Sequence, residues 1–339
     1  MKYSWLLLVL AGTLFAQTKK IKTGLTWEDY AYTMPAGVTA REVTYYSDGV
    51  ACYGKIFFPK GFAASDNRPG IVLGQGWAGT HYSIEKYAAR FAARGMAAMV
   101  IDYRGWGLSD GFAELARPKS LEFPDCRNCR DDQRFTRETM SVTIKRTRLI
   151  PLKMVEDYRN AISYLQGEPG IDRERIGVWG SSFAGGHSLV TAALDARVKA
   201  VVIQIPGIGG KLVQPGPYQP DAKLLEDAIR RARTGQGEEY ETGYSVRRMV
   251  DVETQQAVAE YRPMHYVPRI GPRPVLIMVA ENEELMKNEH HGKAAFDTLP
   301  GPKDFIVLRG ITHFEAYTGE AFETGSKAAA DWFEKYLAK

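Results

Sequence analysis

Residues 176–186 read Ile-Gly-Val-Trp-Gly-Ser-Ser-Phe-Ala-Gly-Gly. The apolar run at 176–179 is typical of a buried strand, and the residues from Phe183 to Leu194 follow a helical pattern. A chain that bends this sharply from strand to helix needs small residues on both sides of the bend and holds one residue at a strained backbone angle. The stretch therefore predicts a turn that projects a serine oxygen above a sheet edge, where the next backbone N–H can hold an oxyanion.

Two adjacent serines compete for the exposed position of this turn. The residue two places before that position must be tiny, because strand and helix nearly touch there. Ser182 has Gly180 in that place whereas Ser181 has Trp179, so we expect Ser182 to be a nucleophile. Ala184 stands two places after it, where glycine is more usual, and adds one methyl group to a tight crossing. The alternative, a serine that only caps a helix, explains one small residue but not the whole run.

The rest of the chain alternates between strand and helix patterns. Residues 42–46 and 52–58 alternate in polarity, and the polar residues between them predict an antiparallel hairpin. Further apolar runs typical of buried parallel strands occupy 71–73, 97–101, 198–203, 274–279 and 305–308. Helical patterns occupy 84–94, 154–165, 293–299 and 326–337. The order predicts an α/β fold, with a mostly parallel central sheet covered by helices on both faces and ligands bound at the carboxyl ends of its strands.

Two long stretches interrupt this alternation. The first, at about 107–149, is rich in charge, and the second, at about 206–269, carries helical patterns at 221–233 and 252–261. Long excursions at the carboxyl ends of strands usually cover or shape a site. We interpret the second as a helical lid insertion; the alternative is a surface decoration remote from the chemistry.

Length and composition suit a single large domain. The chain has 339 residues, 45% of them hydrophobic, which is enough for one α/β core or for one core plus a lid. Its net charge is +4, with acidic and basic residues interspersed. Because no polybasic stripe is present, we expect no nucleic-acid partner.

The N-terminus predicts export. Lys2 precedes an apolar stretch at 5–11, and Ala16 offers a cleavage point, so we interpret 1–16 as a signal peptide and 17–339 as the folded domain. The stretch is shorter than the roughly 20 residues that a spanning helix needs. We therefore expect a periplasmic or secreted protein without stable membrane insertion after signal cleavage.

The chain has three cysteines. Cys126 and Cys129 are close enough in sequence to close a small disulfide in an oxidising compartment. A thioredoxin-like role would need the pair to open a helix after a strand, whereas here a charged stretch follows it. No second Cys/His pair is spaced to complete a tetrahedral metal site, so we expect no metal, and Cys52 is expected to pack in a strand.

Six histidines are candidates for a general base. His313 lies just past the last apolar strand, where a loop should reach the carboxyl edge of the sheet, and we expect it to be the base. His187 falls inside the helix after the nucleophile and is expected to be packed. His290 and His291 follow a charged stretch and are expected to be solvated, while His81 could line the pocket.

A carboxylate that orients the base should follow the preceding strand. The loop after 274–279 offers Glu281, Glu283 and Glu284. We prefer Glu283 for its place in the loop, and Glu281 or Glu284 could substitute.

The oxyanion needs two fixed N–H donors. Phe183 supplies one as the residue after the nucleophile. The other should come from the glycine-rich loop 74–79, where the N–H of Trp77 is the best candidate.

Because it has these residues in this order, the chain resembles the α/β-hydrolase superfamily from about residue 42 to 337. More narrowly, it is similar to the dienelactone-hydrolase and Xaa-Pro-dipeptidyl-peptidase-like group of serine hydrolases. The stretches that carry the resemblance are 74–77, 102–111, 179–186, 281–285 and 310–313. The resemblance implies an α/β-hydrolase fold with Ser182 as nucleophile, Glu283 as acid and His313 as base.

The chain departs from the group's pattern at several positions. It has Gln75-Gly76 where the group usually has His-Gly, and Glu283 is one methylene longer than the usual aspartate. The nucleophile position holds serine and not the cysteine of true dienelactone hydrolases, so specificity for dienelactones is not implied.

The pattern as a whole predicts a secreted serine hydrolase that cleaves small-molecule carboxylic esters through an acyl-enzyme, with no cofactor. One alternative is a peptidase or amidase of the Xaa-Pro-dipeptidyl-peptidase-like type, which would need acidic groups to clasp a substrate amino terminus. Another is a non-catalytic binding protein on the same fold.

Overall fold

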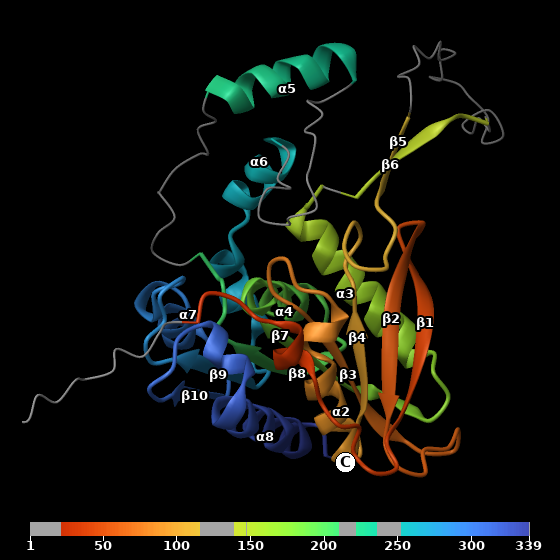
Figure 1. The fold of residues 1–339 in the computed structure, drawn as a ribbon, viewed down its shortest axis with the longest axis vertical. Helices are drawn as coiled ribbons and strands as arrows, with labels where there is room; N and C mark the ends of the chain where they lie inside the picture. The colour runs from red at the N-terminus through yellow and green to blue at the C-terminus, as the bar shows by residue number, and fades with distance from the viewer. Residues whose placement is uncertain (1–21, 116–138, 147, 210–221, 236–251, 339) are drawn as a thin grey trace, which may run out of the picture.

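The structure, a computed structural model, describes residues 22–115, 139–146, 148–209, 222–235 and 252–338. Its centre is an eight-stranded sheet in the order β1-β2-β4-β3-β7-β8-β9-β10 (Figure 1). The strands are β1 (Thr39–Ser47), β2 (Val50–Phe58), β3 (Arg68–Gly74), β4 (Ala97–Ile101), β7 (Ile171–Ser181), β8 (Val198–Gln204), β9 (Val275–Ala280) and β10 (Lys303–Leu308). Each apolar run that the sequence marked as a strand forms one.

The sheet is antiparallel at one edge and parallel elsewhere. β1 pairs with β2, and β2 with β4, in antiparallel register. The pairs from β4 through β10 are parallel. Asp48 and Gly49 join β1 to β2 with φ of 57° and 79°, which is the left-handed pair that a two-residue hairpin turn favours. The predicted mostly parallel sheet with an N-terminal hairpin is confirmed.

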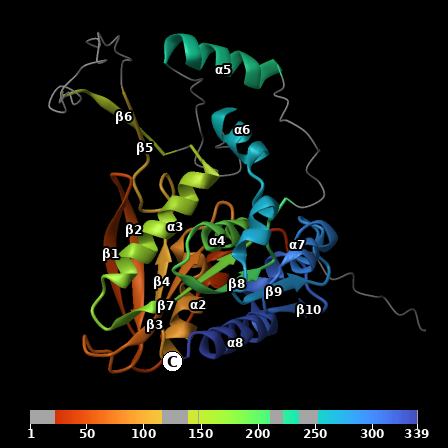
Figure 2. The same ribbon diagram turned by 180° about the vertical axis from the view of Figure 1, so that it is seen from behind.

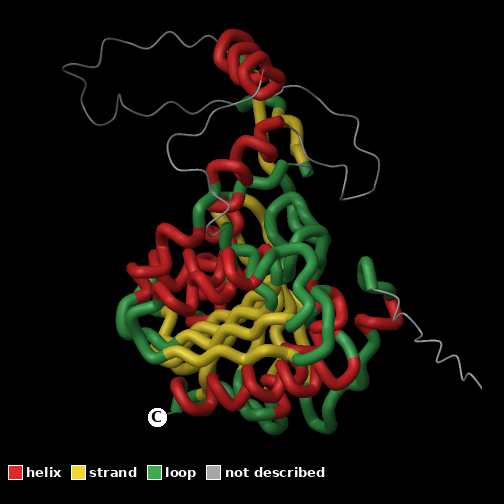
Figure 3. Tube along the Cα trace, turned by 90° about the vertical axis from the view of Figure 1, so that its left-hand side faces the viewer, coloured by secondary structure: helices red, strands yellow, loops and turns green. Residues whose placement is uncertain are grey.

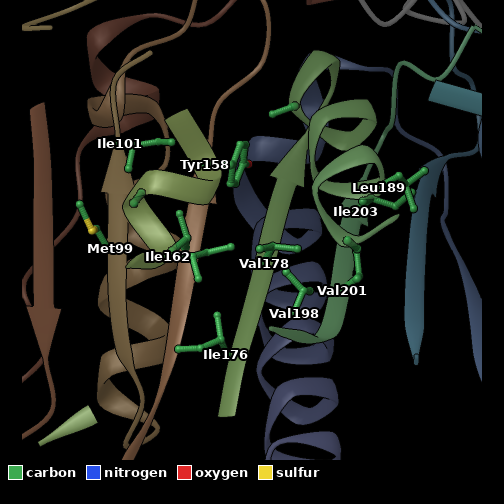
Figure 4. Packing of buried hydrophobic residues seen from close by; sticks show 14 of the residues in the cluster. Met99, Ile101, Tyr158, Ile162, Ile176, Val178, Leu189, Val198, Val201 and Ile203 are labelled. Atoms are coloured by element: carbon green, nitrogen blue, oxygen red, sulfur yellow. The ribbon is translucent and has the colours of Figure 1, made fainter. Parts of the chain in front are cut away.

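Helices cover both faces of the sheet (Figures 2 and 3). One face carries α3 (Pro151–Gln166), α4 (Phe183–Leu194) and α7 (Gly292–Thr298), and the other carries α2 (Glu85–Ala93) and α8 (Gly319–Tyr336). Alternate residues of one strand serve the two faces: Val178 of β7 packs toward α3 and α4, and Trp179 toward α2. Figure 4 shows the first of these two cores.

One helix begins well before its expected start. The sequence pattern placed the last helix at 326–337, but α8 begins at Gly319. Glycines at 319 and 325 weaken the helical pattern of its first turns. Gly325 lies close to the sheet, because a Cβ there would be 3.1 Å from the side-chain oxygen of Gln204.

The two insertions are partly described. The first contains a small hairpin of β5 (Phe112–Leu115) and β6 (Val142–Lys145), which the sequence did not reveal because its strands are short and largely exposed. The second contains α5 (Ala222–Thr234) and α6 (Val252–Glu260), close to the predicted ranges, and both lie away from the sheet in Figures 1 and 2. A 3₁₀ segment, Pro263–Ile270, then leads back along α4.

Several expectations lie outside the described residues. The predicted signal peptide, 1–16, is one of them, and the cysteine pair Cys126 and Cys129 is another. Cys52 is buried in β2 with a free thiol, as expected. Within the described ranges, no helix is both long and apolar enough to span a membrane.

Candidate active site

The turn between β7 and α4 has the strained geometry that its sequence predicts. Ser182 adopts φ 56° and ψ −122°, a backbone conformation that residues other than glycine rarely take. Hydrogen bonds hold it there: its N–H donates to the carbonyl of Gln204 at 2.9 Å, and its carbonyl accepts from the N–H of Gly207 at 2.7 Å. The surrounding backbone therefore fixes the serine at the carboxyl end of β7.

Small residues around the turn are required by contact distances. A Cβ at Gly180 would lie 2.2 Å from the carbonyl oxygen of Ala184, and one at Gly185 would lie 2.5 Å from the side chain of Pro206. A Cβ at Gly76 would lie 2.7 Å from the Cβ of Ser182. The glycines therefore let α4, the loop after β8 and the loop after β3 all approach one serine.

The structure brings the three expected side chains together. Nε2 of His313 lies 3.1 Å from Oγ of Ser182, and Nδ1 of His313 lies 2.9 Å from each carboxylate oxygen of Glu283. The three residues come from loops that follow β7, β9 and β10 at the same edge of the sheet. Side-chain exposure is 3% for His313 and 2% for Glu283, so water does not compete for their contact.

The three candidate glutamates make three different contacts. Glu283 contacts the ring of His313, and Glu284 instead accepts a hydrogen bond from the backbone N–H of His313 at 2.8 Å. Glu281 points to Arg309 and accepts from the N–H of Gly310. Of the three, Glu283 alone is placed to hold the imidazole tautomer in which Nε2 can accept the serine proton.

The expectation that His291 is solvated is wrong. It is buried, and its Nδ1 accepts hydrogen bonds from the N–H groups of Ile208 and Gly209 at 2.9 and 3.1 Å. Burial lowers the pKa of His291, which favours the neutral ring that can accept them. The residue thus fixes the loop after β8, whose Gly207 supports Ser182.

His81 does not line the pocket that contains Ser182, although the sequence left that role open. It is buried, with Nδ1 2.7 Å from Asp102, and its own N–H donates to the same carboxylate at 2.8 Å. Asp102 also accepts from the N–H of Leu108 at 3.0 Å. Asp102 therefore anchors both its own loop and the end of the loop that follows β3.

The two residues expected to supply the oxyanion donors lie near the serine. Trp77 lines the same cavity as Ser182, and its ring packs edge-on against the ring of Phe183 with centroids 5.3 Å apart. Ala78, the next residue of the loop, has φ 65°, so this segment is strained as well. The side chain of Gln75 is buried, 3.5 Å from Asp102 at its nearest polar contact.

A cavity of about 620 Å³ opens onto Ser182 and His313. Its walls come from the loop after β3, from Leu285 and Phe314 in the loops of the acid and the base, and from Leu25 and Tyr30 near the N-terminus. No described residue of α5 or α6 lines the cavity. The role of this insertion as a lid therefore remains a prediction. The N-terminal wall was missed because it precedes the first strand and no motif marks it.

Comparison with known proteins agrees with this fold. Residues 15–209, more than half of the chain, match the family model of acetyl xylan esterase, AXE1. The quorum-quenching protein AidA of Acinetobacter baumannii is 26% identical over 327 residues, which cover 87% of this chain and 95% of AidA.

Two solved structures show the same fold. The structure of DcsB in complex with its substrate analogue aligns with a TM-score of 0.67 and 21% identity, over 89% of this chain and 100% of that one. The acetyl xylan esterase of Paenibacillus sp. R4 aligns with a TM-score of 0.56 and 21% identity, over 89% and 85% of the two chains.

Proposed function

Because the chain belongs to the acetyl xylan esterase family, a family of esterases with the α/β-hydrolase fold, we propose that it hydrolyses carboxylic esters with Ser182 as nucleophile. The observation that carries the proposal is the continuous contact from Ser182 Oγ through the His313 ring to Glu283. A strained serine at the carboxyl edge of the sheet, next to glycine-rich backbone, supports it.

The reaction follows from this geometry. Oγ of Ser182 attacks the ester carbonyl while its proton passes to Nε2 of His313, and Glu283 stabilises the resulting imidazolium. The N–H groups of Trp77 and Phe183 hold the oxyanion. When the tetrahedral intermediate collapses, His313 returns the proton to the leaving alcohol, and the acyl group stays on Ser182. Water then attacks the acyl-enzyme by the same steps, releasing the acid and restoring the serine.

Substitution of the adjacent serines tests the nucleophile. Ser182→Ala should lower kcat for p-nitrophenyl acetate by about a million-fold while the protein stays folded. Ser181→Ala is the matched control, since the hydroxyl of Ser181 donates to the hydroxyl of Tyr317 at 2.7 Å, whereas the hydroxyl that contacts His313 belongs to Ser182. A fluorophosphonate probe should label wild type and Ser181→Ala but not Ser182→Ala. A folded wild type that neither labels nor turns over ester would indicate a non-catalytic binding protein.

Ester cleavage is favoured over peptide cleavage. A peptidase of the related group would need acidic side chains that clasp a substrate amino terminus. Among the described residues that line the cavity, the one carboxylate is Glu284, which already accepts from the N–H of His313. Rates on p-nitrophenyl esters and on aminoacyl-proline p-nitroanilides separate the two functions, and faster turnover of the anilides would favour the peptidase.

The proposed location is the periplasm or the exterior of the cell. Support comes from Lys2, the apolar stretch 5–11 and the small residue Ala16, which together have the form of a signal peptide. N-terminal sequencing of the protein recovered from periplasm or medium should begin near residue 17. Full-length protein in the cytosol would contradict the proposal.

A further inference from the structure

The N-terminal segment 22–32 (red in Figure 1) lies against the active site although it precedes the whole sheet. It contains the short helix α1 (Trp27–Tyr30), which Thr26 begins with a capping box. Leu25 and Tyr30 line the cavity that contains Ser182 and His313. Leu25 also packs against the core on the α2 and α8 side of the sheet. The segment is therefore one wall of the substrate cavity.

A buried lysine fixes this wall to the catalytic loop. Nζ of Lys86, on α2, donates to the carbonyl of Asp29 and to the carbonyl of Tyr317, each at 2.6 Å. Lys86 is 7% exposed, so these charge-assisted bonds are shielded from water. Tyr32 adds a second tie, because its hydroxyl donates to Glu85 of α2 at 2.9 Å. These bonds fix the position of the wall relative to the loop that carries His313.

The cavity includes the place from which the alcohol leaves, because His313 lines it. His313 must return its proton to the alcohol oxygen, so the alcohol portion of the ester sits next to the imidazole. The cavity is lined by Leu285 of the acid loop and by Phe314, the residue after His313. Leu25 and Tyr30 line the same cavity and are therefore available to contact the alcohol portion.

The chemistry of the walls selects an uncharged apolar group. Most of the apolar part of the lining comes from two leucines and four aromatic side chains, and the described residues contribute no lysine or arginine to it. An anionic substituent would lose hydration there without gaining a cationic partner. The volume, about 620 Å³, is within the range of pockets that hold drug-sized ligands and exceeds what a methyl or ethyl group fills.

On the premise of the proposed esterase function, we propose that Leu25 and Tyr30 determine specificity by binding an apolar alkyl or aryl alcohol portion of the ester. Lys86 is the positioning residue that holds them in place. Selectivity for the alcohol thus depends on a segment outside the sheet and its catalytic loops.

The test uses alkyl acetates, whose acyl group is constant and whose alcohols differ mainly in chain length. For wild type, kcat/KM should rise from ethyl to hexyl acetate, by up to about fourfold for each methylene that becomes buried. Leu25→Ala and Tyr30→Ala should each lower kcat/KM for hexyl acetate about tenfold and change that for ethyl acetate less than about twofold. Lys86→Met, which leaves every lining residue in place, should lower the hexyl-to-ethyl ratio in the same direction.

The control is Leu152→Ala, an equal truncation of a leucine on α3 that is 48% exposed and outside the cavity lining. It should keep the wild-type ratio. An unchanged hexyl-to-ethyl ratio in Leu25→Ala and Tyr30→Ala would overturn the inference, as would a wild type that prefers an acetylated xyloside to hexyl acetate. Loss of ethyl acetate turnover and of Ser182 labelling in wild type would instead refute the esterase function itself.

Discussion

His187 should make the protein markedly less stable in mild acid. The residue is fully buried in α4, where its ring packs against Phe183 and Tyr103. Nδ1 lies 2.9 Å from the hydroxyl of Tyr261, and Nε2 has no hydrogen-bond partner among the described residues. Burial lowers the pKa of His187 from 6.5 to about 3, since a charged ring would have no counter-ion here.

The direction and size of the effect follow from proton linkage. Well above pH 6.5 the ring is neutral in both the folded and the unfolded chain, and pH has almost no effect through this residue. Below that value the unfolded chain takes up a proton that the folded chain refuses, so folding loses stability until the pH falls to the folded pKa. Between pH 7.5 and pH 5.0 the free energy of unfolding should therefore fall by about 2 kcal/mol through His187 alone.

Urea unfolding of wild type and His187→Phe at both pH values isolates this contribution. The substitution removes the contact to Tyr261 equally at pH 7.5 and 5.0, so that loss cancels when the two pH differences are compared. The variant should lose about 2 kcal/mol less stability than wild type on acidification. His265→Phe, at an exposed position, should behave as wild type. Equal losses in wild type and His187→Phe would refute the reasoning.

Two further substitutions test the site and its support. Glu283→Gln should lower kcat by about ten-thousand-fold, because an amide cannot hold the imidazolium of His313, whereas Glu281→Gln should keep near wild-type turnover of p-nitrophenyl acetate. Asp157→Asn should lower the free energy of unfolding in urea by about 3–5 kcal/mol. It would leave Arg104, which is 2% exposed and donates to Asp157 at 2.7 and 2.9 Å, without its buried partner; a loss below about 1 kcal/mol would contradict this.

The nucleophile turn was predictable because its geometry is decided within a few residues. Gly180 and Gly185 are required by contacts of 2.2 and 2.5 Å that any side chain would violate. Glycines inside a strand and a helix lower stability, so their presence next to a serine strongly favours the nucleophile turn over other structures. The alternation of Val178 and Trp179 between two cores is local in the same sense, since it follows from the pleat of one strand.

The acid and the buried His291 were less predictable because their partners are distant in sequence. Glu281, Glu283 and Glu284 are equivalent in composition, and the path of the loop after β9 decides which of them meets the ring of His313. His291 follows a charged stretch, yet the loop after β8 covers it and uses it as an acceptor. Neither arrangement leaves a periodic signal in the residues nearby.

Local and long-range features therefore determine different properties of the protein. Ser182 and its glycines are decided by short-range sterics, and they indicate the reaction. The substrate cavity takes Leu25 from before the sheet and Leu285 from a loop near the end of the chain, and a lysine on α2 joins the first of these walls to the catalytic loop. The residues that make such long-range contacts can be replaced without disturbing the turn at Ser182. Because selectivity resides in those walls, relatives that share the turn can differ in substrate while performing the same chemistry.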